Sequence, residues 1–310
     1  MPFAAESGAR RAGLRTAVLC GLLCAVSARA EEPSPGDPVF SRAPADFAAA
    51  PKRETPSFPL ADQKNRAGWT RLDTFWDEFD GDTLDTKKWW PKNPTWEGRP
   101  PGRFDEANVS VSGGQLHLAA RALPAPEPGP GGKAWTHTTA AVQSRETVLY
   151  GHFEVRAKMM PACICNAFWF YHATPERWTE IDVYEIGARA PGKERKVHLT
   201  AHVFRTPESQ THRQWSDALE APFDPSGDFH VYALDWTPER LRWYVDGVLV
   251  REGTNTLWHQ PLTLNLDVEI MEEWFGPPAE GELPAVYDID YVRAWTRASG
   301  PPTEHEEKTP

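Results

Sequence analysis

The residues best suited to chemistry are three acids, Glu180, Asp182 and Glu185, which lie within six positions of one another. Paired carboxyl groups can cleave a glycosidic bond, since one can attack the sugar while the other first donates and then accepts a proton. Three carboxyls on one face cannot all ionise cheaply, so at least one should have a raised pKa and hold a proton near neutral pH. An acid catalyst needs such a proton.

The spacing of these acids sets a condition on the backbone. In a regular strand Glu180 and Asp182 share a face, whereas Glu185, five positions after Glu180, points to the other face. A single β-bulge around Val183 and Tyr184 would return Glu185 to the shared face. The carboxyls of the two glutamates would then lie about 5 Å apart, the separation expected of a glycosidase that retains anomeric configuration.

The same acids could instead form a solvated acidic face or a calcium site. Calcium sites more often use loop oxygens with varied geometry, and a solvated face would not need the apolar flanking residues Ile181 and Ile186. The spacing alone favours catalysis but leaves both alternatives open.

The elements that would position the acids have the pattern of strands. Apolar and polar residues alternate in short runs, which is typical of strands, at residues 108–111, 115–119, 152–159, 197–204, 231–236 and 241–245. Residues 241–250 also predict a hairpin, because Asp246-Gly247 is a turn signal between two such runs. No helical periodicity is sustained, so we expect an all-β fold with two antiparallel sheets packed face to face.

The chain divides into four segments. Residues 1–30 carry arginines, then a short apolar run, then Ala28-Arg29-Ala30, the order of a secretory signal peptide that is cleaved after Ala30. Residues 31–65 are rich in Pro and Ala, and we expect a flexible or loosely packed lead-in. Residues 66–297 form the folded domain, and the polar residues 298–310 form a disordered tail.

The composition limits the partners. The formal net charge of −11 becomes about −14 once the four arginines and one glutamate of the leader are removed. Such a surface attracts neither nucleic acid nor an anionic membrane, and no later segment has the length of about 20 apolar residues that a membrane helix needs. We therefore expect a secreted or periplasmic monomer that binds neither nucleic acid nor a membrane.

Two of the four cysteines, Cys163 and Cys165, remain after the leader is removed. Residues two apart on a strand point the same way, about 6.6 Å apart, which suits a disulfide poorly. A metal pair lacks further cysteine or histidine ligands at the usual spacing. We expect free, partly buried thiols.

The acid motif, Glu-x-Asp-x-x-Glu at residues 180–185, resembles the active-site signature of glycoside hydrolase family 16. The resemblance covers residues 69–296 and includes residues 77–85, 108–116, 167–170, 233–236, 244–247 and 287–293. It implies a β-jelly-roll sandwich with an open substrate cleft on the concave face. It also implies that Glu180 is the nucleophile, Glu185 the acid/base and Asp182 an assisting residue.

Aromatic and polar residues near the acids are candidates for substrate binding. Trp178 falls on the face of the acids by alternation, and a flat indole can stack on a sugar ring. The resemblance places Trp169 and His202 near the cleft. The further candidates, for outer positions of the cleft and for sulfate or hydroxyl groups, are Trp96, Arg99, Glu273 and Trp274.

No cofactor is required for this chemistry, but a structural calcium ion fits the resemblance. Glu78 and Asp290 lie near the opening and closing strands, where many family members hold calcium. Ordinary surface acids explain these two residues equally well.

The residues around the acids resemble the family branches that include agarases, porphyranases and κ-carrageenases. We therefore expect a retaining endo-hydrolase whose partner is a β-linked polysaccharide, a red-algal galactan. A β-1,3-glucanase or a transglycosylase is the alternative within the same chemistry. A lectin-like sandwich without catalysis is the rival from another class, and the presence of all three acids argues against it.

Overall fold

The computed structural model describes residues 36–297, and the compact unit discussed below begins at Pro38. The predicted signal peptide (1–30), the first residues of the lead-in (31–35) and the predicted tail (298–310) lie outside the described residues. Within the described part, no helix is both long enough and apolar enough to cross a membrane.

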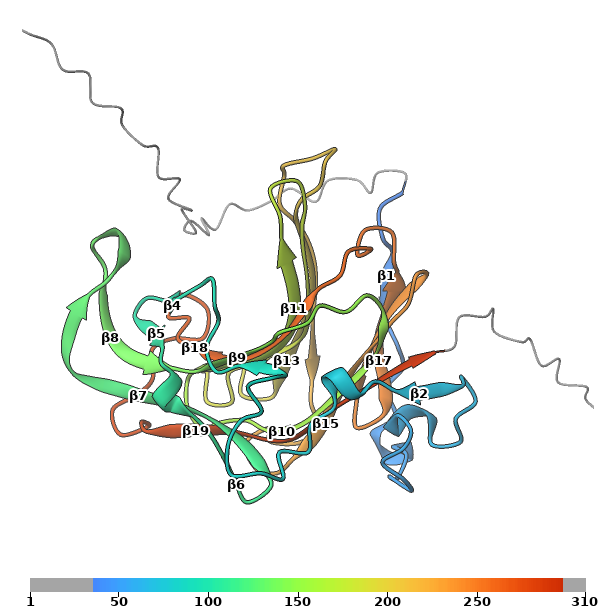
Figure 1. Ribbon diagram of the computed structural model, residues 1–310, viewed down its shortest axis with the longest axis horizontal. Coiled ribbons are helices and arrows are strands. Elements are labelled where there is room, and N and C mark those ends of the chain that lie inside the picture. Colours follow the sequence, from blue (N-terminus) through green and yellow to red (C-terminus); the bar gives the residue numbers. More distant parts are fainter. Residues whose placement is uncertain (1–35, 298–310) are drawn as a thin grey trace, which may run out of the picture. The chain divides into compact units, whose positions relative to one another are not determined.

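Two β-sheets make up this unit (Figure 1). The smaller sheet has seven strands, in the spatial order β14 (Arg213–Glu220), β13 (Lys196–Arg205), β12 (Trp178–Ile186), β11 (Cys165–Ala173), β18 (Thr263–Glu269), β9 (Ala141–Ser144) and β3 (Trp89–Trp90).

The larger sheet has twelve strands. Its main path is β1 (Phe40–Arg42), β17 (Val248–Thr254), β16 (Arg240–Val245), β15 (His230–Trp236), β10 (Gly151–Lys158), β19 (Ala285–Arg297), β7 (Gln115–Pro128), β8 (Ala134–Thr139), β5 (Gly102–Phe104) and β4 (Gly98–Arg99). Off this path, β2 (Trp69–Arg71) pairs with β19 and β6 (Val109–Ser112) pairs with β7. The helical segments of the described residues are short 3-10 turns: η1 (Phe47–Ala49), η2 (Leu60–Asp62), η3 (Asp73–Phe75), η4 (Glu106–Asn108) and η5 (Pro130–Gly132).

The two sheets form two layers. Figure 1 shows β9, β13 and β18 in one layer and β10, β15 and β19 in the other, and the smaller sheet curves so that its outer face is concave. The strand pairings are antiparallel, apart from the parallel pair of β5 with β8. The predicted all-β sandwich is confirmed, with that one parallel pair as an exception.

The hydrophobic core lies between the layers and follows from the alternation along the strands. In β18, Leu264, Leu266 and Val268 are fully buried in the core cluster, while Asn265 and Asp267 alternate with them on the outer face.

The predicted hairpin is also present, since β16 and β17 pair through a turn at Asp246-Gly247, where both residues have positive φ. Two large core residues, Trp236 at the end of β15 and Trp243 on β16, are completely buried.

The prediction of a flexible lead-in is wrong for residues 38–65, which pack against the sandwich. β1 extends the larger sheet by pairing with β17. Further along, Arg53 donates to the carboxylate of Glu154, whose side chain is only 1% exposed. The backbone N–H of Leu60 donates to the other oxygen of Glu154. The composition hid these contacts, because the lead-in has little regular structure and its partners lie about a hundred or more positions away.

We predict that Arg53→Met destabilises the protein by about 3 kcal/mol, because it leaves the buried carboxylate of Glu154 without its cationic partner. The double variant Arg53→Met/Glu154→Gln should recover most of this loss, since it removes the buried charge as well. The free energy of unfolding in urea at pH 7 measures both effects.

Lys64→Met is the matched control for this prediction. Its ion pair with Glu54 is exposed on both sides, so its loss should change the free energy of unfolding by less than about 1 kcal/mol. Equal effects of the two single variants would show that Arg53 does not neutralise a buried charge.

Candidate active site

The three acids lie on β12, and the strand bulges between the second and the third. Against β11, Phe168 and Trp169 pair with Tyr184 and Asp182, so Val183 is an extra residue in β12. Against β13, the register of β12 shifts in the same place. The bulge that the spacing required is confirmed.

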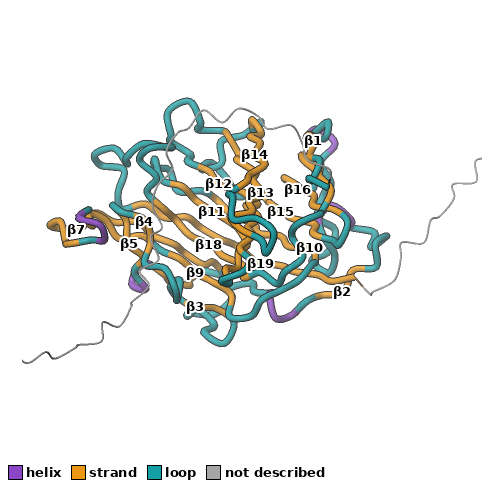
Figure 2. Tube along the Cα trace, turned by 90° about the horizontal axis from the view of Figure 1, so that it is seen from above, coloured by secondary structure: helices purple, strands orange, loops and turns teal. Residues whose placement is uncertain are grey.

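The bulge sorts the side chains of β12 between two faces. Ile181, Val183, Tyr184 and Ile186 all belong to the core between the sheets. The acids lie on the outer face of the sheet, in which β12 is followed by β11, β18 and β9 (Figure 2). Asp182 is nearly buried there, at 4% exposure.

His202 on β13 pairs directly with Glu180 and approaches two of the acids. Its Nε2 lies 3.2 Å from Oδ2 of Asp182 and 4.0 Å from Oε1 of Glu180. The contact with Asp182 is close but lacks hydrogen-bond geometry, since that oxygen has no hydrogen-bond partner. On its other side, Nδ1 of His202 lies 3.0 Å from Nε2 of His212. His212 was not identified from the sequence, because no spacing relates it to the acids.

A second pair of acids, Asp267 and Glu269, lies on β18 and was also missed. Both are at most 5% exposed. Asp267 accepts a hydrogen bond of 3.0 Å from Nε1 of Trp169, and Glu269 accepts one of 2.9 Å from Nε of Arg99. The alternation along β18 could have placed both acids on the outer face, but only the strand order shows that this face adjoins β11 and then β12.

Burial is the main cause that raises the pKa of each acid on β12. For Glu180 and Glu185 the charge of Asp182 is the next cause, while His202 acts in the opposite direction. Burial and then the charge of Glu269 raise the pKa of Asp182 to about 8. The cluster therefore keeps at least one proton at neutral pH.

Three of the predicted binding aromatics gather in one cluster. Trp169 is packed with the partly buried Trp96 and Trp274. The guanidinium of Arg99 lies 5.8 Å from the ring centre of Trp96. Glu273, in contrast, is exposed beside Trp274.

Trp178 is placed apart from this cluster. Its indole stacks on Phe204, with ring centres 4.2 Å apart, and Phe204 in turn stacks on His212 at 4.3 Å. The ring of His202 lies 5.2 Å from that of His212, so a row of aromatic rings leads from Trp178 to the acids. The binding roles of these aromatics stay predictions.

The predicted calcium ligands each face an arginine instead. Both carboxylate oxygens of Glu78 accept hydrogen bonds from Arg293, at 2.9 Å, and Asp290 accepts one of 2.8 Å from Arg156. A guanidinium that already neutralises a carboxylate competes with a cation for the same oxygens, so this donor set does not fit calcium. Among the described residues, the group whose ligand atoms could hold a metal ion is that of Glu180, Asp182 and His202 on β12 and β13.

Cys163 and Cys165 are both free and buried, as predicted. The thiol of Cys163 donates to the carbonyl of Phe275. Cys165 belongs to the same cluster as Trp169, and burial, followed by the charge of Glu185, raises the pKa of its thiol well above the usual value. Cys165 is therefore an uncharged, buried side chain of this cluster.

Comparison with known proteins gives a family match. Residues 69–297 match the family model described as the GH16 domain of beta-porphyranases A–D. Beta-porphyranase E of Zobellia galactanivorans is 29% identical, over 74% of this chain and 88% of that protein. The kappa-carrageenase of Pseudoalteromonas carrageenovora is 31% identical, over 52% of this chain and 47% of its own length. Among solved structures, porphyranase B of Zobellia galactanivorans aligns with a TM-score of 0.66 and 24% identity, over 74% of this chain and 92% of that one.

We predict that Asp182→Asn stabilises the protein progressively as the pH rises. A carboxyl whose pKa is higher in the folded than in the unfolded protein costs stability once the pH exceeds its unfolded value, near 4, and up to its folded value of about 8. The variant should gain about 2 kcal/mol or more at pH 8 and almost nothing at pH 4. Urea unfolding at several pH values measures this difference.

Asp80→Asn, which changes an exposed aspartate, is the control. Its plot of unfolding free energy against pH should run parallel to that of the parent protein. Parallel curves for Asp182→Asn would mean that Asp182 is ionised in the folded protein at neutral pH.

Proposed function

Because the chain belongs to glycoside hydrolase family 16, we propose that it hydrolyses internal β-linkages of a red-algal galactan of the porphyran type with retention of configuration. The observation that carries this proposal is the bulge at Val183, which puts Glu180, Asp182 and Glu185 on one face of β12. A retaining mechanism needs two carboxyls that reach the same glycosidic bond.

In the first step of the proposed mechanism, a carboxylate oxygen of Glu180 attacks the anomeric carbon, and the bond from that carbon to the leaving oxygen breaks. Glu185 gives its proton to the leaving oxygen, so the departing sugar is neutral and a glycosyl ester remains on Glu180. In the second step, Glu185 takes a proton from water, the water oxygen bonds to the anomeric carbon, and the ester bond breaks.

Asp182 and His202 assist in this proposal without touching the scissile bond. The raised pKa of Asp182 favours a neutral acid at pH 7, which can donate a hydrogen bond to the nucleophile without adding a third negative charge. His202 lies 3.2 Å from Asp182 and 4.0 Å from Glu180. It is therefore placed to respond to changes in the charge of these two acids during the reaction.

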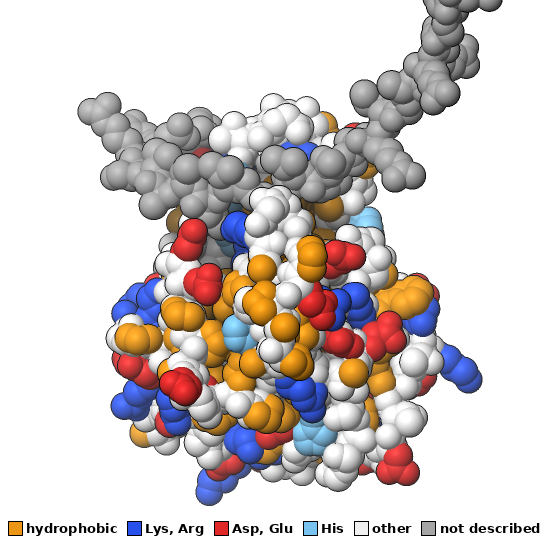
Figure 3. All heavy atoms as spheres, turned by 90° about the vertical axis from the view of Figure 1, so that its left-hand side faces the viewer, with side chains coloured by type: hydrophobic (Ala, Val, Ile, Leu, Met, Phe, Trp, Pro, Cys, Tyr) orange, Lys and Arg blue, Asp and Glu red, His pale blue; other side chains and the backbone are white. Residues whose placement is uncertain are grey.

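The substrate class is supported by the family match with porphyranase domains and by the porphyranase and carrageenase relatives. The net charge of −11 argues against a densely sulfated polymer. Figure 3 shows acidic, basic and apolar side chains intermingled on the face that it presents. Arg99 beside the acids, with a side chain that is 42% exposed, is the cation best placed to meet a single sulfate group.

A reducing-end assay on porphyran, agarose, κ-carrageenan, laminarin and lichenan tests the proposal. We predict release of reducing ends from porphyran above all, and a loss of about 10³-fold or more for Glu180→Gln. Glu106→Gln, which changes an exposed residue of η4, should leave the rate unchanged. EDTA should not inhibit, since the proposed chemistry uses no metal.

Each failure in this assay has a distinct meaning. Binding without any release of reducing ends would indicate a lectin, and products longer than the input chain would indicate a transglycosylase. Preference for laminarin would replace the galactan with a β-1,3-glucan, and a normal rate for Glu180→Gln would refute the assigned nucleophile.

We also propose that the protein is exported and acts as a monomer outside the cytoplasm. A polymer too large to enter a cell requires an enzyme outside the cytoplasm, and residues 1–30 have the order of an export signal. The first residue of the exported protein should be Glu31, and light scattering after gel filtration should give the mass of one chain. A protein that retains Met1 in the cytoplasmic fraction would contradict export.

A further inference from the structure

Two buried indoles hold the backbone of the catalytic strand from behind. Nε1 of Trp243, on β16, donates to the carbonyl oxygen of Asp182 at 2.9 Å. Nε1 of Trp258 donates to the carbonyl oxygens of Glu180, at 2.9 Å, and of His202, at 3.1 Å. Both tryptophans are fully buried. The carbonyls that they bind belong to the very residues whose side chains form the site on the other face of the sheet.

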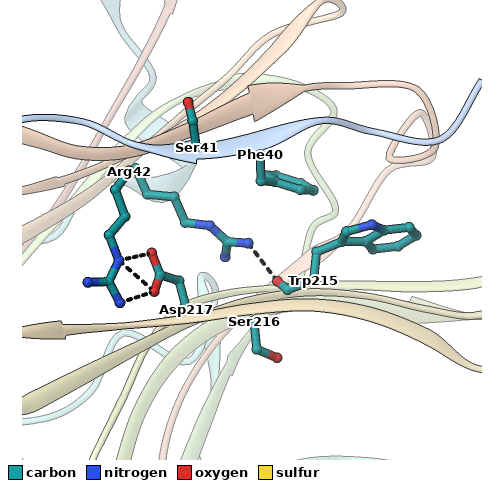
Figure 4. A pocket seen from close by; sticks show the side chains of 7 residues that line it. Phe40, Ser41, Arg42, Trp215, Ser216 and Asp217 are labelled. Atoms are coloured by element: carbon teal, nitrogen blue, oxygen red, sulfur yellow. Dashed lines mark hydrogen bonds and ion pairs between the residues drawn. The ribbon is translucent and has the colours of Figure 1, made fainter. Parts of the chain in front are cut away.

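A residue from the lead-in packs against both indoles. The ring of Phe40, on β1, lies 5.8 Å from Trp243 and 6.0 Å from Trp258, in edge-to-face contact with each. Phe40 also lies 6.2 Å from Trp215 of β14. Phe40 and Trp215 both line a hollow of about 330 Å³, and Figure 4 shows them with the other side chains that line it.

The space for Phe40 is made by a glycine in the partner strand. Gly253 pairs with Phe40 in the sheet, and a Cβ at this position would lie 2.1 Å from the ring. The φ of Gly253 is not in the left-handed region, so the backbone conformation does not require glycine here. Glycine is required at this position because the ring of Phe40 approaches the backbone closely.

An arginine ties the same ring to the strand beside β12. The guanidinium of Arg251, which is 2% exposed, lies 4.5 Å from the ring centre of Phe40 and 5.0 Å from that of Trp243. It donates to the carbonyl oxygens of Leu199 and Trp215. Leu199 lies on β13 between Thr200 and His198, the partners of Asp182 and Glu185 at either end of the bulge.

We propose that β1 is a positioning element for the catalytic acids, in which Phe40 fixes the indoles of Trp243 and Trp258 and thereby the backbone at Glu180 and Asp182. This role rests on the proposed function of those acids. It assigns a part in catalysis to a segment that precedes residues 69–297, the part that matches the family. The acids need such support, because a bulge removes regular ladder contacts where their spacing must be held.

The test compares Phe40→Ala with Phe47→Ala in the full-length protein. Phe47 also belongs to the lead-in and packs partly buried against the core, 6.4 Å from Phe223, without a contact to either indole. For Phe40→Ala we expect kcat on the cleaved polysaccharide to fall by about tenfold or more, with KM within about threefold, at a temperature where circular dichroism shows the variant folded. Phe47→Ala should keep kcat within about twofold of the parent value.

A second measurement does not depend on activity. In ¹⁵N-labelled protein, the indole N–H groups of Trp243 and Trp258 should exchange with solvent at least about tenfold faster in Phe40→Ala than in the parent. The indole of Trp169, which donates to Asp267 on the outer face, is the internal control and should not change. If Phe40→Ala does not fold, Phe40→Leu gives the same comparisons with smaller effects.

The outcomes separate this inference from the proposed function. A folded Phe40→Ala with parental kcat refutes the positioning role, and so does an equal loss of kcat in Phe47→Ala. If the parent protein cleaves no polysaccharide, the proposed function fails. The exchange of the indole N–H groups then decides whether Phe40 holds the strand. An unchanged exchange rate in Phe40→Ala would refute the positioning role.

Discussion

Because side chains alternate along a strand, two glutamates five positions apart can face the same side only where the strand gains an extra residue. Val183 is that residue. It lets Val183 and Tyr184 both enter the core while Glu180 and Glu185 stay outside. The pairing of β12 with β11 and β13, the burial of the core and the grouping of the acids all depend on this one shift in register.

The outer face of the smaller sheet concentrates negative charge that the fold alone does not need. Asp182, Asp267 and Glu269 are each at most 5% exposed, and burying carboxylates without full compensation is costly. Arg99 offsets part of this charge, and protonation offsets another part because burial raises the pKa of the acids on β12. A site whose local chemistry opposes stability in this way is typical of function.

The sequence was most informative where the pattern is local. Alternation predicted the strands, Asp246-Gly247 predicted the hairpin, and the spacing of the acids predicted the bulge. It was least informative where contacts join distant residues. Nothing local relates Asp267 to the acids on β12, since only the order β12, β11, β18 brings these strands close together in one sheet. The ion pair of Glu78 could not be foreseen for the same reason, because its partner Arg293 lies 215 positions away.

The lead-in illustrates how a domain defined by family similarity can differ from the domain that packs. The similarity begins at residue 69, yet the compact unit begins at Pro38. Without β1, the strand β17 would present an unpaired edge, and Gly253 would leave a space with no side chain to fill it. Without Arg53, Glu154 would be a buried carboxylate that has lost its strongest cation. Residues 69–297 alone would therefore have an open strand edge, an unfilled space and an uncompensated buried charge. This part of the sequence is adapted to the segment before it, and the two must be treated as one folding unit.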